Sequence, residues 1–273
     1  MGLDEEVRRF RSEDMVPPAI EYLSRPAKVS MADQWFEVAS MEHFWIQRRF
    51  RVLQMLAGKS IREARELAEI GCGNGLLQKQ IEGNYERSVT GLDLNEYALT
   101  RNVSTRSRVC CYDILDRNPK LEGSFDVIFL FDVLEHIRDE ASFLDALLFH
   151  LAPGGRLIVN VPAGSWAFSA YDRVAGHVRR YSIASLSKTA DGNVLDITAW
   201  TYWGLPLVPT LAVRKLWLAM QRNQDSIVRT GFDTRAPWIN RALGLLSTLE
   251  PIPQKMMGTS LMAVLQRRLS GGL

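Results

Sequence analysis

The sequence predicts an α/β fold built around a mostly parallel sheet. Three observations support this expectation: a glycine-rich segment connects a strand to a helix, two further short strands each end in an aspartate, and residues 123–132 are apolar almost throughout. The last pattern is typical of a strand that helices cover on both faces. With 273 residues, of which 47% are hydrophobic, the chain can bury a large interior without disulfides.

The glycine-rich segment, residues 69–75, reads Glu-Ile-Gly-Cys-Gly-Asn-Gly. Because glycine lacks Cβ, its backbone can bend tightly and approach a ligand, and the following helix offers unpaired N–H groups at the same place. A dinucleotide-binding turn spaces its glycines as G-x-G-x-x-G. Here Gly71, Gly73 and Gly75 alternate and Glu69 precedes them. This spacing favours S-adenosylmethionine, which has no phosphate and whose ammonium an acid can help to place.

Two acids downstream complete the predicted nucleoside pocket. Residues 88–93 form a short apolar strand that ends in Asp93, from where a carboxylate can accept both ribose hydroxyls. A second such strand ends in Asp113, so we expect Asp113 and Ile114 at the adenine edge. A fourth strand is predicted at 123–132, and residues 151–162 are expected to form a turn followed by a fifth strand.

The order and spacing of these motifs resemble the class I S-adenosylmethionine-dependent methyltransferases, specifically their bacterial small-molecule branch. The resemblance runs from Glu69 to Pro162, and beyond the glycine turn it includes Leu92-Asp93, Asp113, Phe125-Asp-Val-Ile, Asp132-Val-Leu-Glu-His136 and Pro153-Gly-Gly155. It implies a Rossmann-like, seven-stranded sheet whose last strand is antiparallel. It also implies a cofactor lying across the carboxyl ends of the first, second and fourth strands. It does not identify the methyl acceptor.

Residues 1–60 form a predicted N-terminal helical cap. A helix near 43–57 places Arg49 in the middle of its apolar face, where a guanidinium left unpaired would be strongly destabilising. Related enzymes use an N-terminal arginine for the methionine carboxylate of the cofactor; alternatively, Arg49 pairs with a protein acid or reaches the surface. Arg48 and Arg51 are expected on the solvated side. The predicted cofactor contacts are Arg49, Glu69, Gly71, Cys72, Gly73, Asn74, Gly75, Asp93, Leu94, Asp113, Ile114 and Asp132.

Residues 163–182 follow the predicted fifth strand at the carboxyl edge of the sheet, where acceptor substrates of this fold lie. We call them the active-edge loop. A segment resembling its Gly-His-x-Arg-Arg-Tyr sequence, here 176–181, marks a bacterial subgroup associated with the modification of glycans, lipids or other secondary metabolites. Under the structural alternative, Ser182 caps a helix that runs to about Thr189, and the arginines are its solvated approach. The candidate functional residues of the loop are Asp172, His177, Arg179, Arg180 and Tyr181.

Proton transfer is the role expected of His177 if the acceptor is a hydroxyl, because an unperturbed imidazole is largely neutral at pH 7. Asp172 would orient the ring, and Arg179 and Arg180 would hold a substrate carboxylate or phosphate by forked hydrogen bonds. His136 is the competing base. Its alternative role is structural, as the start of the helix beneath the cofactor.

A third addition, residues 204–253, separates the predicted strands 196–202 and 259–266. Its first half is strongly apolar, and we expect the neighbouring Tyr202 and Trp203 to contact the acceptor. The uncharged run is shorter than the roughly 18 residues that a bilayer requires. Three interpretations stay open: a helical lid over a hydrophobic acceptor, a dimer interface, and an interfacial anchor near lipid-linked substrates. The methyltransferase core is then expected at 61–203 and 254–273.

These features together predict S-adenosylmethionine-dependent O-methylation of a small molecule or glycoconjugate hydroxyl. Two alternatives are C- or N-methylation of a quinone-like or amine acceptor, and a protein that keeps the cofactor pocket without methyl transfer. A formal charge of +2 gives no basic field for nucleic acid. The three cysteines lack the spacing of a metal site or disulfide framework, so no metal is predicted. The N-terminus does not read as a signal sequence, which makes a cytoplasmic location the expectation, and the apolar insertion is compatible with a homodimer.

Overall fold

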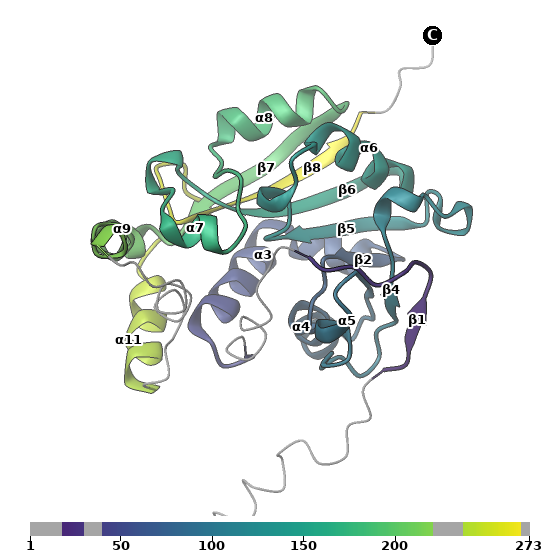
Figure 1. Ribbon diagram of the computed structural model, residues 1–273, viewed down its shortest axis with the longest axis horizontal. Coiled ribbons are helices and arrows are strands. Elements are labelled where there is room, and N and C mark those ends of the chain that lie inside the picture. Colours follow the sequence, from purple (N-terminus) through teal and green to yellow (C-terminus); the bar gives the residue numbers. More distant parts are fainter. Residues whose placement is uncertain (1–17, 30–39, 221–236, 269–273) are drawn as a thin grey trace, which may run out of the picture.

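One sheet runs through the molecule, with helices on both of its faces (Figure 1). The structure is a computed structural model and describes residues 18–29, 40–220 and 237–268. The strands are β1 Ile20–Tyr22, β2 Leu67–Ile70, β3 Thr90–Asp93, β4 Val109–Cys111, β5 Phe125–Phe131, β6 Leu151–Pro162, β7 Leu195–Trp203 and β8 Ser260–Arg267. The α-helices are α3 Phe44–Glu63, α4 Leu76–Tyr85, α5 Glu96–Leu99, α6 Glu140–His150, α7 Ala170–Val174, α8 Ile183–Asp191, α9 Val208–Met220 and α11 Pro237–Ser247. Short 3₁₀ helices lie at Ile114–Asp116, Pro119–Leu121, Leu134–His136, Ser165–Ala167 and Leu205–Leu207.

The strands follow the order β1-β4-β3-β2-β5-β6-β8-β7. The first six of these pair in parallel, and β8 runs antiparallel to both of its neighbours, β6 and β7. The Rossmann-like α/β sheet with an antiparallel last strand is therefore confirmed. The predicted count of seven strands is wrong, because Ile20–Tyr22 adds an eighth strand at the edge by pairing with Val109–Cys111.

Two apolar layers enclose the sheet. One contains Leu147 of α6 and Leu186 of α8, and the other contains Leu53 of α3 and Ile81 of α4. Consecutive residues of β5 enter opposite layers, because side chains alternate along a strand. This double burial explains why 123–132 is apolar at nearly every position. Parallel pairing places the carboxyl ends of β2, β3 and β5 along one edge.

Local patterns located most elements close to their observed bounds. Ser182 caps α8 as predicted, since its hydroxyl accepts a hydrogen bond from the Ser185 N–H at 3.1 Å. The N-terminal cap differs from the expectation of a purely helical addition to residue 60, because it includes β1 and its helix α3 continues to Glu63. Residues 1–17 and 30–39 of that cap lie outside the described residues.

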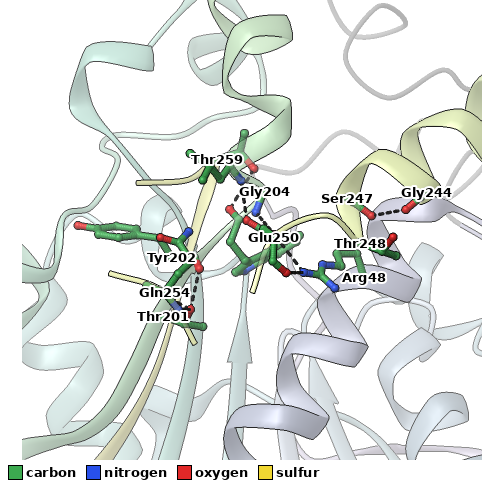
Figure 2. A network of polar contacts seen from close by, with 12 residues as sticks. Arg48, Thr201, Tyr202, Gly204, Gly244, Ser247, Thr248, Glu250, Gln254 and Thr259 are labelled. Atoms are coloured by element: carbon green, nitrogen blue, oxygen red, sulfur yellow. Dashed lines mark hydrogen bonds and ion pairs between the residues drawn. The ribbon is translucent and has the colours of Figure 1, made fainter. Parts of the chain in front are cut away.

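The insertion before β8 is fastened to the N-terminal helix by a buried carboxylate (Figure 2). Glu250 accepts hydrogen bonds from the backbone N–H groups of Gly204 and Leu205, at 2.7 and 2.8 Å, and lies 3.3 Å from Arg48. Arg48 is therefore buried rather than solvated as predicted, because the returning chain supplies its counterion; Arg51 is exposed as expected. Of the helices in the described ranges, none is long and apolar enough to cross a bilayer.

Replacing Glu250 with alanine should lower the free energy of unfolding by about 3 kcal/mol, because it leaves a buried guanidinium without its counterion. Chemical denaturation measures the change. Glu63→Ala is the matched control: its pair with Lys59 is exposed on both sides, so a change under about 0.5 kcal/mol is expected. Equal effects of the two substitutions on the free energy of unfolding would contradict the assignment of Glu250 as the buried counterion of Arg48.

Glu82 on α4 anchors the loop before β4. Its two carboxylate oxygens accept five hydrogen bonds, from the backbone N–H groups of Thr105, Arg106 and Ser107 and from the hydroxyls of Thr105 and Ser107. Burial alone would raise the pKa of Glu82, but the bonds from Ser107, Thr105 and Arg106 outweigh it and hold the pKa below its usual value.

Glu82→Gln should destabilise the protein by about 3 kcal/mol at neutral pH, since an amide opposes several of these donors. A pKa that is lower in the folded than in the unfolded state gives stability that is complete above the unfolded value and lost as the pH falls through the folded one. The gap between wild type and variant should therefore shrink below about pH 4. Urea titrations at several pH values test this, and a gap that stayed constant would refute the role of the ionised carboxylate.

Candidate active site

The glycine turn lies at the carboxyl end of β2 and leads into α4. Gly71 and Gly75 have φ values of 74° and 77°, in the left-handed region that side chains disfavour. A Cβ on Gly71 would lie 2.3 Å from Cγ2 of Val133, and one on Gly75 would lie 2.4 Å from Oδ1 of Asn102. Packing against the protein itself therefore requires glycine at both positions, and the backbone of the turn is left without side chains there, which would also allow a ligand to approach closely.

Glu69 lies directly beneath this turn and is buried. Its Oε2 atom has no hydrogen-bond partner among the described residues. Burial raises the pKa of Glu69 to about 8; Arg49 partly opposes this, and Asp93 and Asp132 add to it. A buried acid with an open oxygen fits a cationic ligand, and the ammonium of S-adenosylmethionine is one. The side chains of Cys72 and Asn74 are buried, which leaves the backbone of the turn for contact.

Asp93 ends β3 beside the same turn. Its Oδ2 accepts the Gly73 N–H and its Oδ1 accepts the Asn95 N–H, each at 2.8 Å. A carboxylate offers about four lone-pair positions, so two remain for the hydroxyls of a ribose. Burial raises the pKa of Asp93 against these backbone hydrogen bonds. The position predicted from the sequence is thus filled by a carboxylate that is held rigidly and still able to accept.

Asp113 and Ile114 follow β4. One carboxylate oxygen of Asp113 accepts the Leu115 N–H at 2.9 Å and caps the 3₁₀ helix Ile114–Asp116. Ile114 is buried, and the carbonyl of Leu94 accepts a hydrogen bond from the Ala27 N–H at 3.1 Å. The adenine contact expected of Asp113 therefore has to use its second oxygen, and it stays a prediction.

Arg49 of α3 reaches the end of β5, where its Nη1 lies 2.6 Å from Asp132 Oδ2. The guanidinium also lies over the rings of Trp45 and Phe131, 5.0 and 5.1 Å from their centroids. The sequence left open whether Arg49 meets the cofactor or a protein acid, and the structure shows the protein acid. The ion pair borders Glu69, so a cofactor contact by Arg49 or Asp132 stays a proposal.

Asn160 of β6 joins this ion pair to the core. Its side chain donates to Asp132 Oδ1 at 2.9 Å and accepts from the Trp203 indole N–H at 2.9 Å. Trp203 is fully buried. The predicted acceptor contact by Trp203 is therefore corrected: its side chain belongs to the core and orients the Asn160 amide.

His177 and Asp172 meet in the active-edge loop, as predicted. His177 Nδ1 lies 3.0 Å from Asp172 Oδ1, and since a carboxylate only accepts, Nδ1 carries the proton and Nε2 keeps a lone pair. Asp172 also accepts from Arg180 Nε at 2.7 Å and from the Ser169 N–H at 2.8 Å. Burial would raise the pKa of Asp172, but the bonds and charges of His177 and Arg180 prevail and lower it to about 2.

The predicted substrate-binding residues of the loop mainly hold the loop in place. Arg180 donates to Asp172 and to the Ala163 carbonyl. The buried Tyr181 hydroxyl is 3.2 Å from the Leu134 carbonyl and 2.5 Å from Glu140 Oε1, so its assignment to the substrate is corrected. Arg179 pairs with Glu140 and is about one-third exposed, which leaves it available to an acceptor. Tyr202 is half-buried, and its hydroxyl accepts the N–H of Ile183, the first residue of α8.

His136, the competing base, lies in the 3₁₀ helix Leu134–His136 rather than at the start of a long helix. Burial lowers the pKa of His136 to about 4, and the positive charge of a protonated His177 adds to this. The rings of the two histidines stand edge to face with centroids 4.8 Å apart. A histidine with so low a pKa is neutral at pH 7, and it is a poorer proton acceptor than an ordinary imidazole.

Three polar residues of this region were not assigned from the sequence: Glu135, Asn160 and Glu250. Asn160 did leave a signal, because it interrupts the apolar run of β6 and a buried amide needs partners. Glu135 stands within the quoted Asp132–His136 motif, but only the fold shows that it is 1% exposed. Glu250 follows α11, and no local pattern reveals its contact with Arg48.

A glycine turn, an acid beneath it and a ribose-competent aspartate at adjoining strand ends define a Rossmann-like domain of the kind that binds an adenosyl cofactor. The family model described as a methyltransferase domain matches residues 41–204. The chain belongs to this family. It carries a methyltransferase domain, and relatives of this domain are named as probable S-adenosylmethionine-dependent methyltransferases.

Curated relatives include a protein of Mycolicibacterium smegmatis named as a probable S-adenosylmethionine-dependent methyltransferase, 34% identical over 44% of this chain and 46% of its own length. The ubiquinone biosynthesis O-methyltransferase of Marinobacter nauticus is 34% identical over 34% of this chain and 42% of its own length. The aligned part is thus about half or less of each relative.

Solved structures share the fold at low sequence identity. Phosphoethanolamine N-methyltransferase 2 of Haemonchus contortus, in complex with S-adenosylhomocysteine, covers 88% of this chain and 58% of its own, with 15% identity and a TM-score of 0.54. The [4+2]-cyclase SpnF covers 93% of this chain and 89% of its own, with 15% identity and a TM-score of 0.50. One architecture therefore carries different reactions, and the acceptor has to be argued from the site.

Proposed function

We propose that the protein transfers the methyl group of S-adenosylmethionine to a hydroxyl of a small molecule or glycoconjugate. The observation that carries the proposal is the histidine at the carboxyl edge, His177, whose Nδ1 is held by Asp172 so that Nε2 can accept a proton. Relatives named as ubiquinone biosynthesis and tocopherol O-methyltransferases support oxygen as the acceptor atom. A domain that uses a methyl donor thus has a candidate base where an acceptor would lie.

The cofactor fits the residues at the ends of β2 and β3. Asp93 would accept the ribose hydroxyls with its remaining lone pairs, and the glycine turn would lie against the adenosyl group. Glu69, buried with an open oxygen, would face the ammonium group. When bound, the cofactor supplies a methyl group made electrophilic by the sulfonium.

The residues of the loop prepare the acceptor. His177 Nε2 would take the proton of the acceptor hydroxyl and so become protonated, while the bound cofactor would supply the methyl group to the hydroxyl oxygen. Asp172 keeps the ring in the required tautomer and stabilises the positive charge, as a carboxylate does in a hydrolase triad. Proton transfer of this kind contributes roughly 10²- to 10⁴-fold in rate, and alignment with the donor contributes on the order of 7 to 11 kcal/mol.

The acceptor would be held by Arg179, which is partly exposed, and covered by the insertion before β8, acting as a lid. Leu216, Trp217, Trp238 and Leu245 of α9 and α11 are exposed apolar side chains, in keeping with contact to an apolar acceptor, a second copy of the chain or a membrane surface. We rank the lid first, because α9 contacts α7 of the active-edge loop. A homodimer and peripheral membrane contact are the alternatives, and with a formal charge of +2 we do not propose nucleic-acid binding.

The test is release of S-adenosylhomocysteine from purified protein and labelled S-adenosylmethionine across hydroxyl, amine and quinone-like acceptors. Acceptor-dependent release with a methyl ether as product is expected. A product methylated on carbon or nitrogen would refute oxygen as the acceptor. If the protein binds the cofactor but releases no S-adenosylhomocysteine with any acceptor, it would instead be a protein of this fold that does not transfer methyl groups. The [4+2]-cyclase SpnF is an example of this fold with a different reaction.

A further inference from the structure

Three metal-ligating side chains converge between the 3₁₀ helix Leu134–His136 and the active-edge loop. The ligand atoms of Glu135, His136 and His177 all lie within 4.8 Å of one another. These residues come from two parts of the chain that are far apart in sequence. Backbone contacts fix the approach, since the N–H of Val178 donates to the Glu135 carbonyl at 2.8 Å.

The carboxylate of Glu135 is the unusual member of this group. The residue is 1% exposed, and its Oε2 has no hydrogen-bond partner among the described residues. The nearest basic atom to its Oε1 is His177 Nε2 at 4.0 Å, and within the described chain no arginine or lysine forms an ion pair with it. An open carboxylate oxygen in a buried site can accept a bond from a cation that enters the cluster.

The two histidines are already oriented around Glu135. His177 Nδ1 is committed to Asp172, so its lone pair on Nε2 is directed toward the cluster rather than toward Asp172. A carboxylate that holds the second nitrogen of a ligating histidine is the arrangement that orients and strengthens metal ligands. The ring of His136 stands edge to face against that of His177, with the ring centroids 4.8 Å apart.

We propose that Glu135, His136 and His177 bind one divalent cation, with Zn²⁺ as the best match. Two imidazole nitrogens and one carboxylate oxygen suit zinc rather than magnesium, and three protein ligands leave a position for a further oxygen ligand. The ligand atoms of one tetrahedral Zn²⁺ stand about 3.3 Å apart, so side-chain movements of about 1.5 Å would bring these three ligand atoms to coordination distance. The spacing of these residues along the chain gave no such indication, because His177 is distant from the other two.

The ion and the acceptor proton would compete for the same lone pair of His177. In the metal-bound protein the cation, not His177, would therefore promote loss of the hydroxyl proton, because a bound cation lowers the pKa of an oxygen ligand. The inference concerns the same edge as the proposed function but does not depend on methyl transfer.

Binding is tested on the full-length protein by competition for Zn²⁺ with a chromophoric chelator, without S-adenosylmethionine or acceptor. One Zn²⁺ per chain is expected, with at least about 100-fold weaker binding for Glu135→Gln and His177→Gln and about 10-fold weaker binding for Asp172→Asn. His43→Asn is the matched control, because His43 is a buried histidine that lies outside the cluster. The His43 side chain caps α3 by accepting a hydrogen bond, and asparagine can fill the same role. It should bind as the wild type does.

Circular dichroism confirms that each variant is folded, and Glu135→Gln is the conservative variant if His177→Gln is unstable. Absence of stoichiometric Zn²⁺ binding, or equal weakening by His43→Asn, would overturn the inference. Zinc binding without methyl transfer would support the metal site and refute the proposed function. Methyl transfer without zinc binding would support the proposed function and refute the metal site.

Discussion

Asp93→Ala should weaken binding of both S-adenosylmethionine and S-adenosylhomocysteine by roughly 10²- to 10⁴-fold. In the proposed cofactor site, the substitution would remove two charge-assisted hydrogen bonds to the ribose, each of which would contribute roughly 1.5 to 3 kcal/mol. Calorimetric titration with S-adenosylhomocysteine measures the effect directly, because the product binds without turnover. Undiminished affinity would remove Asp93 from the pocket and with it the argument that places the cofactor at this edge.

A structural contribution has to be separated from this result, because Asp93 also accepts the N–H groups of Gly73 and Asn95. Asp93→Asn provides the separation. The amide oxygen can still accept a backbone hydrogen bond, but the amide NH₂ group meets one hydroxyl or N–H donor and cannot accept from it. We therefore expect an intermediate loss of affinity for S-adenosylhomocysteine and a smaller loss of stability than in Asp93→Ala. Asp113→Asn serves as a second comparison, since the cap on Leu115 needs only one of its oxygens. Its effect on affinity should be the smallest of the three.

The glycine turn and the acid at the end of β3 could be predicted because their sequence patterns are local. The turn at 69–75 needs glycine where φ is positive, and the acid after β3 follows from an apolar strand of fixed length. Each signal involves residues that are close in sequence, so spacing alone located them. The same holds for the cap of α8 by Ser182.

The acceptor half could be predicted only in part, because its contacts join residues that are distant in sequence. Trp203 and Tyr181 have side chains suited to a substrate, yet both are buried and hydrogen-bonded within the protein. Arg48 reads as solvated until Glu250 returns beside it. In each of these cases the side chain by itself suggested one role, and a contact with a residue distant in sequence gave it another.

The active-edge loop shows how the two kinds of information combine. The sequence placed five functional side chains within 163–182 and left a structural role open as the alternative. The structure supports both interpretations for different residues: Arg180 and Tyr181 fasten the loop, and this rigidity is what fixes the His177 ring at 3.0 Å from Asp172. A base on a mobile loop would align less often with an acceptor, so the anchors serve the proposed reaction indirectly.

Replacing His177 with alanine should lower kcat by roughly 10²- to 10⁴-fold while affinity for S-adenosylhomocysteine stays within about twofold of wild type. The proposed cofactor contacts are at the ends of β2 and β3 and do not include His177, so the loss should fall on turnover of the ternary complex. His43→Asn, a second buried histidine, should retain full turnover.

Added imidazole distinguishes the chemical role from a structural one. The cavity left by His177→Ala lies beside Asp172, which can orient a free imidazole as it orients the side chain, and recovery of part of the lost kcat is expected. A merely packing role would show reduced stability without imidazole-dependent recovery. Asp172→Asn should reduce kcat in the same direction, because an amide no longer fixes the Nδ1–H tautomer. Unchanged turnover in His177→Ala would show that proximity to the sulfonium suffices for this acceptor, and it would transfer the search for a base to His136.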